Sequence, residues 1–441
     1  MADERTNPET SDETDLEAVL AARRGPAQVR PLGSLAVPRA VDAQGLAAET
    51  PKWSRVLAIP LYVAAMLALA VGVFVVGHPV VGIAIVLIAV VPAVGVVILA
   101  NARLPQLLGP AATHECEGAA EVPGLGGPVP LAANPELGLW LGARRETLAA
   151  WAPTLIEEEL DTLVRNRDAE AAKTQTWLAE LGEPERVEVT ATDGTRLRAR
   201  VMPSGRAEEG DGGLWVVLLH GYRGSWRDGL LHARRYAERG FNVLLPDLRC
   251  HGKSGGAWAG LGLLDRDDLV TWCSWIVLRA GRNARIVLHG VGMGAAAALL
   301  AAADEGLPSQ VRACVADSAY SDAWNVAVRL LGGSDGRQSA HPMIDLMRLS
   351  LRLRADGYDV ARARPEDAVA ASRVPVLLLQ GDQDTVVPPY MAKRLSEACG
   401  GAAAGENHGL VMIEGAGHGE SALADPVGYY WRVRTFEDRY L

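Results

Sequence analysis

The hydrophobic positions from residue 186 onward fall into eight short runs rich in Val, Leu and Ile, separated by longer amphipathic segments. This alternation is typical of a largely parallel sheet covered by helices. The first two runs are joined by Thr192-Asp193-Gly194, and an Asp-Gly pair at this point favours a β-hairpin. The expected strands are 186–191, 196–202, 214–220, 241–247, 285–290, 311–317, 375–382 and 409–415.

Two longer apolar runs precede this region, at residues 56–77 and 80–100, and neither contains a charged side chain. At 1.5 Å per residue each run would form a helix of roughly 30 Å, which is the thickness of the hydrocarbon core of a bilayer. Buried helices of soluble proteins rarely extend so far without a polar position. We therefore predict a two-helix transmembrane hairpin at 56–100, with its turn at Gly77-His78-Pro79.

The basic residues around the hairpin predict its orientation. Lys52 and Arg55 precede the first span and Arg103 follows the second, whereas the turn contains neither Lys nor Arg. Cytoplasmic flanks carry the excess of these residues, so both termini and the C-terminal domain are expected on the cytoplasmic side of the cell membrane. Neither span contains an ionisable group that would indicate a transport path.

The remaining N-terminal segments differ in composition. Residues 1–50 begin with an acidic stretch rich in Ser, Thr, Asp and Glu, which favours a disordered tail. Residues 101–143 are rich in Gly and Pro and are expected to form a linker. Residues 144–185 mix charged and apolar positions, so we expect a helical segment that packs on the outside of a domain at 186–441.

Composition narrows the classes of function. The formal net charge of −10 argues against nucleic acid as a partner, because phosphate contacts need clustered Lys and Arg. The five cysteines are dispersed without a CxxC spacing, which indicates reduced thiols and no metal site. No motif indicates a cofactor, and none specifies an oligomeric state.

The loops that follow the predicted strands carry the candidate chemistry, because open α/β sheets place their sites at the carboxyl ends of the strands. These loops combine small residues with His, Asp, Arg and Ser. In chain order they are HGYRGSW (220–226), DLRCHGKS (247–254), HGVGMG (289–294), GDQDTVVP (381–388) and GAGHGE (415–420).

With these five motifs in this order, the chain resembles the α/β-hydrolase superfamily, and it looks most similar to bacterial membrane-anchored serine-aminopeptidase-like (S33-type) hydrolases. The resemblance covers about 186–441. It implies an α/β-hydrolase fold of about eight strands with helices on both faces, a lineage of serine ester and amide hydrolases, and a lid insertion at about 322–373. Two positions depart from the pattern: Cys250 stands where Gly is usual, and Gly292 stands where the nucleophilic Ser is usual.

The resemblance implies roles for the residues around position 292. Gly290 and Gly294 would relieve crowding at the strained strand-to-helix elbow that normally exposes the nucleophile. Backbone N–H groups of Tyr222 and Met293 would form the oxyanion hole, since backbone donors survive any change of side chain. The turn is therefore expected to persist at Gly292 without the side chain that used it.

The acid and the base of the triad are both present. Asp384 would orient the ring of His418, select its tautomer and stabilise its positive charge. Their order along the chain, after position 292, is the order expected for this fold. The neighbouring polar residues are expected to pack against the strands or brace the loops: His289, Asp247, Arg249 and His251.

The first function consistent with this pattern is a pseudo-hydrolase that binds a small ester- or amide-like ligand or a partner protein. Removing the serine of such a triad costs about 10⁶ in rate. The superfamily includes non-enzymatic members, and those of the N-Myc downstream-regulated family resemble this chain in lacking a usable nucleophile.

The second function is an active hydrolase. In this hypothesis His418 activates a water molecule directly as a general base, in the space that Gly292 leaves. Another group would otherwise have to attack, and the loops on the same edge of the sheet supply Cys250, Ser318 and Ser321.

The third function is dinucleotide binding. Gly290, Gly292 and Ala295 satisfy a GxGxxA pattern between a strand and a helix, and Asp317 ends the next strand. A turn without side chains lets a phosphate approach a helix N-terminus. However, the other four motifs would then be coincidental, and such a fingerprint normally follows the first strand of its sheet, so the hydrolase interpretation is preferred.

Overall fold

An eight-stranded sheet forms the centre of the chain's C-terminal part. The computed structural model describes residues 71, 153–204, 212–332, 348–353, 358–400 and 408–441. All eight predicted strands are present, each within two residues of its expected bounds. They are β1 (Glu185–Thr190), β2 (Arg196–Met202), β3 (Leu214–Leu219), β4 (Phe241–Asp247), β5 (Arg285–Val291), β6 (Val311–Asp317), β7 (Val376–Gly381) and β8 (His408–Ile413).

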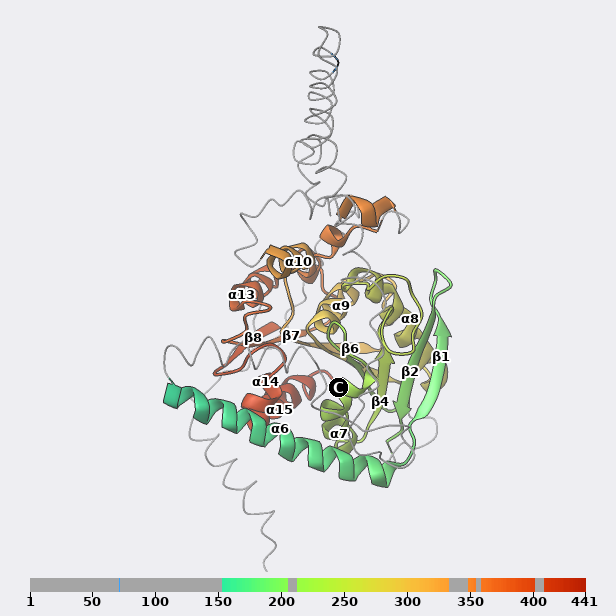
Figure 1. Ribbon diagram of the computed structural model, residues 1–441. Coiled ribbons are helices and arrows are strands. Elements are labelled where there is room, and N and C mark those ends of the chain that lie inside the picture. The colour runs from blue at the N-terminus through green and yellow to red at the C-terminus, as the bar shows by residue number, and fades with distance from the viewer. Residues whose placement is uncertain (1–70, 72–152, 205–211, 333–347, 354–357, 401–407) are drawn as a thin grey trace, which may run out of the picture. The chain divides into compact units, whose positions relative to one another are not determined.

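The strands lie in the order β1-β2-β4-β3-β5-β6-β7-β8 (Figure 1). β1 and β2 form the predicted antiparallel hairpin, in which the Ala191 N–H donates to the Thr195 carbonyl at 2.8 Å and Gly194 has φ +84°. β2 is also antiparallel to β4, and the six strands from β3 to β8 are mutually parallel. The predicted α/β fold is therefore confirmed, and the carboxyl ends of six strands meet at one edge of the sheet.

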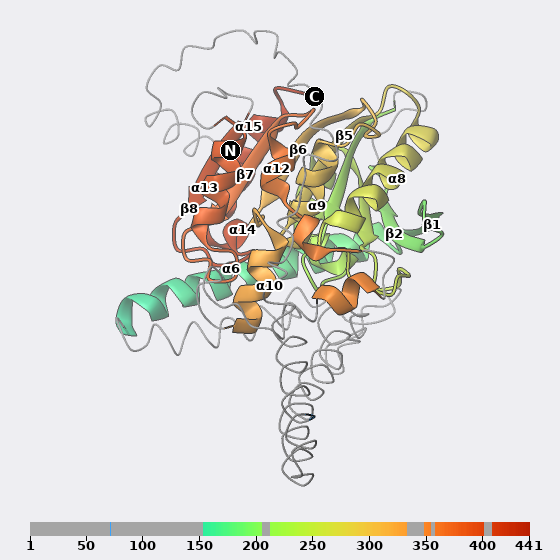
Figure 2. The ribbon, with the colours of Figure 1, turned by 90° about the horizontal axis from the view of Figure 1, so that it is seen from above.

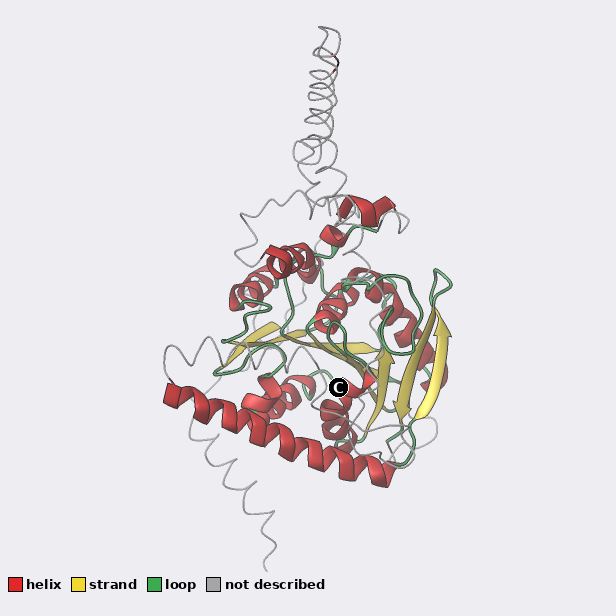
Figure 3. Cartoon of the chain, in the orientation of Figure 1, coloured by secondary structure: helices red, strands yellow, loops and turns green. Residues whose placement is uncertain are grey.

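Helices cover both faces of the sheet (Figures 1 and 3). The longer helices are α6 (Pro153–Leu181), α7 (Leu230–Glu238), α8 (Leu263–Ala280), α9 (Met293–Ala302), α10 (Ala323–Gly332), α13 (Pro389–Ala398) and α15 (Pro426–Glu437). The shorter ones are η1 (Trp226–Gly229), η2 (Val360–Arg362), α12 (Pro365–Val369) and α14 (Ser421–Ala424). Figure 2 shows β1 at one edge of the sheet and β8, with α13, at the other.

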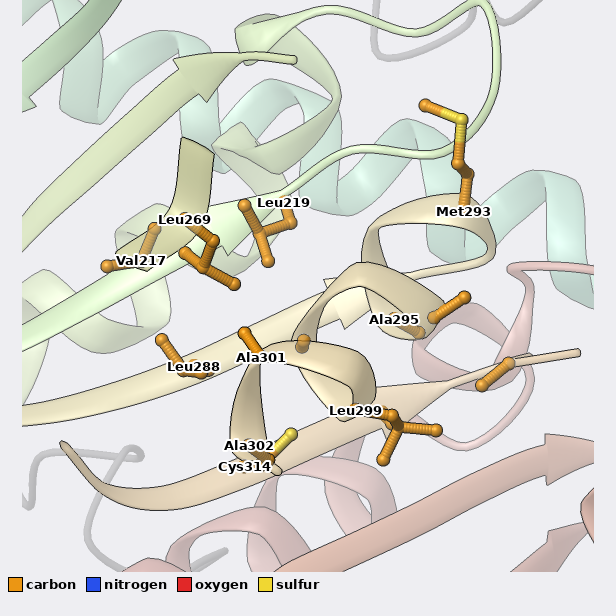
Figure 4. Packing of buried hydrophobic residues seen from close by; sticks show 14 of the residues in the cluster. Val217, Leu219, Leu269, Leu288, Met293, Ala295, Leu299, Ala301, Ala302 and Cys314 are labelled. Atoms are coloured by element: carbon orange, nitrogen blue, oxygen red, sulfur yellow. The ribbon is translucent and has the colours of Figure 1, made fainter. Parts of the chain in front are cut away.

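Successive residues of a central strand pack against opposite helical layers. In β3, Val217 and Leu219 belong to the core cluster shared with α8 and α9, whereas Val216 and Leu218 belong to the cluster shared with α7 and α15. Every residue of α9, Met-Gly followed mainly by Ala and Leu, is buried, and such small side chains let a helix lie close to a sheet (Figure 4). Because buried parallel strands are apolar on both faces, the sequence shows them as continuous hydrophobic runs.

The helical segment expected at 144–185 contains α6, which lies along the layer of α7 and α14 (Figure 1). Leu163 and Leu178 are buried in the same core cluster as α7 and α15. The Asn166 side-chain amide donates to the Leu423 carbonyl at 2.7 Å, which attaches α6 to α14.

Several predicted segments lie outside the described residues: the tail at 1–50, the linker at 101–143 and, apart from Val71, the transmembrane hairpin at 56–100. Within the described ranges, no helix is both long enough and apolar enough to cross a bilayer. The insertion expected at 322–373 is described in part and contains α10, a short helix at 348–353, η2 and α12. Its role as a lid stays a prediction.

Candidate active site

The turn between β5 and α9 is as tight as the sequence predicts. Gly292 precedes the first residue of α9 and has φ +56° and ψ −114°. A Cβ on Gly290 would lie 2.3 Å from the backbone carbon of Gly294, and a Cβ on Gly294 would lie 2.4 Å from the Leu219 carbonyl oxygen. Neither neighbour is a side chain that can rotate away, so these two positions accept only glycine.

Gly292 differs from its two neighbours. A Cβ at this position would meet no backbone atom closer than 3.8 Å, where the Cα of Gly221 lies. Its nearest neighbour would be the Nε2 atom of His418, at 3.1 Å. A side chain on residue 292 would therefore point directly at the imidazole, which would have to shift slightly, and the residue would keep a positive φ of +56°.

Asp384 and His418 form a hydrogen-bonded pair. The His418 Nδ1 atom lies 2.8 Å from Asp384 Oδ2. The other carboxylate oxygen accepts from the N–H groups of Val386 at 2.9 Å and Val387 at 2.8 Å, while the Gln380 amide donates to Oδ2 at 3.0 Å. With Nδ1–H donated to the carboxylate, Nε2 is the ring atom that faces residue 292. Asp384 is fully buried and the imidazole is 23% exposed, so the base is accessible to a ligand and the acid is not.

The two predicted oxyanion donors lie beside the same turn. Met293 is the first residue of α9, so its N–H has no acceptor within the helix. Tyr222 directly follows Gly221. The Cα of Gly221 would lie 3.8 Å from a Cβ on residue 292. Figure 4 shows α9 beginning at Met293. The glycine turn and the imidazole thus lie together, with Met293 and Tyr222 next along the chain to residues of this site, and their role as oxyanion donors stays a prediction.

The polar residues after β4 brace their own loop, as predicted. Asp247 accepts from the N–H groups of Trp226 and Lys253, each at 2.9 Å. Arg249 forms two hydrogen bonds with the Asp268 carboxylate, at 2.6 and 2.7 Å. His251 accepts from the Arg223 N–H at 3.0 Å and is buried, and burial lowers the pKa of this imidazole to about 4.

His289 is a packed histidine, as predicted. Its Nδ1 lies 3.0 Å from the Tyr236 hydroxyl and its Nε2 lies 2.9 Å from the Tyr429 hydroxyl. The residue is 1% exposed, and burial holds the pKa of its imidazole well below the ordinary value. Both ring nitrogens are used inside the core, so His289 has a structural role.

The three candidate substitute nucleophiles are all buried. Cys250 has φ +65°, which explains why Gly is usual at this position, and burial raises the pKa of its thiol to about 11. Ser318 donates to Asp317 Oδ1 at 2.9 Å and accepts from the Gly419 N–H at 3.1 Å. Ser321 is fully buried. A thiol that stays protonated and a hydroxyl with two partners are poor nucleophiles.

The glycine pattern of the dinucleotide hypothesis follows the fifth strand of the sheet. The carboxylate of Asp317, which would have to reach a ribose, is 1% exposed and accepts from the Ser318 and Ser421 hydroxyls. Among the residues that the structure describes, no three His, Cys, Asp or Glu side chains are grouped as metal ligands would be.

Three residues around the site were not predicted in these roles. Gln380 lies inside a strand and its amide binds Asp384, although the sequence shows only a polar residue at the end of an apolar run. Asp317 and Ser318 bind the elbow and the histidine loop, and the only signal was their position after the sixth strand, at the same sheet edge.

Comparisons with known proteins concern the fold. The sequence profile described as "Alpha/beta hydrolase family" matches residues 216–430. Protein YqkD of Bacillus subtilis (strain 168), which is uncharacterized, is 27% identical over 226 residues, covering 51% of this chain and 70% of YqkD. Protein YfhR of Escherichia coli (strain K12), also uncharacterized, is 28% identical over 214 residues, covering 48% of this chain and 66% of YfhR.

Among solved structures, the Pyrococcus furiosus esterase Pf2001 is similar, with a TM-score of 0.45 and 23% identity over 58% of this chain and 93% of the esterase. A puromycin-hydrolyzing peptidase of Mycobacterium tuberculosis has a TM-score of 0.41 and 22% identity, covering 58% of this chain and 38% of the peptidase. The strand order, the profile match and the sequence relatives identify residues 216–430 as an α/β-hydrolase domain.

Proposed function

We propose that this chain is a membrane-anchored, S33-type member of the superfamily whose site binds a small ester- or amide-like ligand, or the corresponding group of a partner protein, without covalent catalysis. Asp384 and His418 act as the retained acid and base, Tyr222 and Met293 supply the oxyanion donors, and Gly292 occupies the place of the nucleophile. A ligand carbonyl would bind beside His418 and the N-terminus of α9.

A single distance carries this proposal: a Cβ on residue 292 would lie 3.1 Å from His418 Nε2. The base is therefore aimed at a position that carries no oxygen to deprotonate. Loss of the serine from a complete triad reduces the rate by about 10⁶, equivalent to about 8 kcal/mol of barrier. Binding through the imidazole and the backbone donors does not need that serine, so it survives this loss.

The proposal is tested by restoring the missing oxygen. Gly292→Ser in the full-length chain is expected to hydrolyse p-nitrophenyl acetate at least 100-fold faster than Gly292→Ala. Both substitutions add a Cβ and pay the same cost of a positive φ, about 1–3 kcal/mol. The alanine variant is therefore a matched control, and only the hydroxyl differs. Adding His418→Ala to the serine variant should abolish the gain. A serine variant that folds like the alanine variant and is equally inert would refute the proposed site.

A second candidate is hydrolysis by a water molecule that His418 activates directly. The observation in its favour is that Nε2 faces residue 292 across a gap without any side chain, while Nδ1 is held by Asp384. The same assay separates the two candidates. Turnover by the unmodified chain that disappears in His418→Ala would establish water activation and exclude a purely binding function.

We further propose that residues 56–77 and 80–100 anchor the chain as a hairpin, with both termini and the hydrolase domain in the cytoplasm. The support is their lack of charge and the positions of Lys52, Arg55 and Arg103. Alkaline phosphatase fused after Leu441 should be inactive and a fluorescent protein at the same point should fluoresce. The reverse result would overturn the orientation.

A further inference from the structure

Asp317 and Ser318, directly after β6, lie between the two halves of the candidate site. Both residues are buried, Asp317 at 1% and Ser318 at 0% exposure. The Gly292 N–H donates to the Asp317 carbonyl at 2.9 Å, so the elbow is attached to the end of β6. The Gly419 N–H donates to the Ser318 hydroxyl at 3.1 Å, so the segment that follows His418 is attached there too.

The conformation of Ser318 makes this second bond possible. Its φ of +56° lies in the left-handed region, which is uncommon for a side chain larger than glycine. The Ser318 N–H donates to the Leu379 carbonyl at 2.9 Å and its hydroxyl donates to Asp317 Oδ1 at 2.9 Å. With its proton given to Asp317, the hydroxyl oxygen is left to accept from Gly419. Three hydrogen bonds thus hold Ser318 in a strained conformation, and residues held in this way cluster at functional sites.

His418 is held on both sides through the backbone. On one side the Gly417 N–H donates to Glu420 Oε2 at 2.7 Å, a contact within the same loop. On the other side the Gly419 N–H donates to Ser318, a residue 101 positions away. The Ser318 contact joins the residue after His418 to the end of β6. The residues before His418 are joined instead to the loop after β7, where the Gln383 N–H donates to the Ala416 carbonyl and the Gly415 N–H donates to Asp382 Oδ1, both at 2.9 Å. Asp384 orients the ring about its own axis but binds neither the elbow nor Gly419.

We propose that Ser318 is a positioning residue: its hydroxyl fixes the distance between residue 292 and the His418 imidazole by joining the histidine loop to the strand end that holds the elbow. This inference rests on the proposed function, because it assigns a purpose to that distance. Ser318 takes no part in bond formation. It replaces the earlier hypothesis that this hydroxyl is itself a nucleophile.

A thiol introduced by Gly292→Cys measures the distance without any need for hydrolysis. Next to a protonated imidazole and a helix N-terminus, a thiol has a pKa well below its free value of about 8.5. We expect an apparent pKa below about 7 for the introduced thiol, measured from the pH dependence of iodoacetamide alkylation of the residue-292 peptide by mass spectrometry. Adding His418→Ala should raise the thiol pKa toward its free value, and the size of this rise is the part of the shift that the imidazole causes.

The test is Ser318→Gly in this thiol background, in the full-length chain. Glycine adopts a positive φ without strain, so the substitution removes the hydroxyl and the backbone can keep its conformation. We expect the thiol pKa to rise by about one unit, seen as a roughly tenfold slower alkylation at acidic pH. The thermal midpoint should stay equal or increase. Ser421→Ala is the matched control, because Ser421 also donates to Asp317 Oδ1, at 2.8 Å, but the Gly419 N–H binds Ser318 and not Ser421.

The possible results are distinct. A pKa that rises with Ser318→Gly but not with Ser421→Ala supports the inference. A pKa unchanged by Ser318→Gly, or raised equally by both substitutions, overturns it while the proposed function stands. An ordinary pKa in Gly292→Cys alone shows that residue 292 does not face His418, which overturns the proposed function and this inference together.

Discussion

Three glycines of one turn differ in what a side chain would meet. At Gly290 and Gly294 a Cβ would enter backbone atoms at 2.3 and 2.4 Å, whereas at Gly292 it would approach only an imidazole, at 3.1 Å. Backbone atoms thus exclude a side chain at Gly290 and Gly294, whereas at Gly292 a side chain would meet another side chain and would have to adopt a φ of +56°.

This difference predicts the effect of adding one methyl group. Gly290→Ala should lower the free energy of unfolding by ~3 kcal/mol or more, because the neighbouring backbone cannot move aside without displacing α9. Gly221→Ala is the control. Its Cβ would lie 3.7 Å from the nearest atom, the Val291 carbonyl oxygen, so a change within about 0.5 kcal/mol is expected. Thermal unfolding of both variants checks this, and equal destabilisation would contradict it.

At the scale of elements, α6 is attached to the domain by one buried stripe. Within residues 162–181, where the burial of α6 is described, the buried residues are Leu163, Glu170, Thr174 and Leu178, at the spacing of one helical face. Glu170 binds both Arg234 and Arg235, and the Arg234 side chain is itself buried, at 7% exposure. Although burial favours the neutral acid, Arg235 and Arg234 hold the pKa of Glu170 below its ordinary value.

Removal of this carboxylate should therefore loosen α6. Glu170→Ala removes the buried carboxylate that pairs with Arg234 and Arg235 and leaves Arg234 with only the half-exposed Glu238, at a cost of about 1.5–3 kcal/mol. The expected result is faster amide hydrogen exchange across 162–181. Lys173→Ala is the control, because Lys173 also pairs with Glu170 but is 60% exposed, and its loss should change little. Unchanged exchange in Glu170→Ala would show that the apolar contacts alone hold the helix.

At the scale of the whole molecule, buried titratable groups act on stability in opposite directions. Burial raises the pKa of Asp265 and Glu437 to about 7, and lowers the pKa of His220 and His232 to about 4. The carboxyls stabilise the fold fully at low pH, and this contribution is lost as pH rises toward 7. The two histidines have the opposite effect. They are neutral in the fold, whereas the unfolded chain binds protons at these positions below about pH 6.5, so their contribution to stability is lost as pH falls toward 4.

Replacing one of these carboxyls by a neutral amide measures how much that group contributes to the pH dependence of stability. In Asp265→Asn the neutral amide oxygen can still accept from the Gly262 N–H, which binds Asp265 Oδ2 at 2.8 Å. Relative to the unmodified chain, the variant should gain stability as pH rises from about 4 to 7, by on the order of 4 kcal/mol. Thermal midpoints of the two full-length chains across this range should diverge. Parallel curves would mean that Asp265 ionises normally.

The sequence by itself determined the strands, their approximate bounds and the order of the five motifs. These follow from local chemistry: apolar runs mark buried strands, and glycines mark positions where a side chain cannot fit. It also determined that residue 292 brings no nucleophile, since no folding can add an atom. The roles of His289 and Arg249 as packed or bracing residues followed from their places at strand ends, and their hydrogen bonds confirm them.

Only the tertiary structure decided which distant groups meet. The contact of Ser318 with Gly419 joins residues 101 positions apart, the Arg234–Glu170 pair joins residues 64 positions apart, and neither has a local pattern. In the sequence, Gln380 cannot be told apart from other polar residues. Its role is visible only in the fold, where its amide donates to Asp384 in the loop after β7. The local pattern of apolar residues determines whether a segment forms a strand or a helix. The hydrogen-bond partner of a buried polar atom depends instead on how those strands and helices pack. That is why the glycine at position 292 could be interpreted from the sequence, whereas the contact between Ser318 and Gly419 could not be predicted.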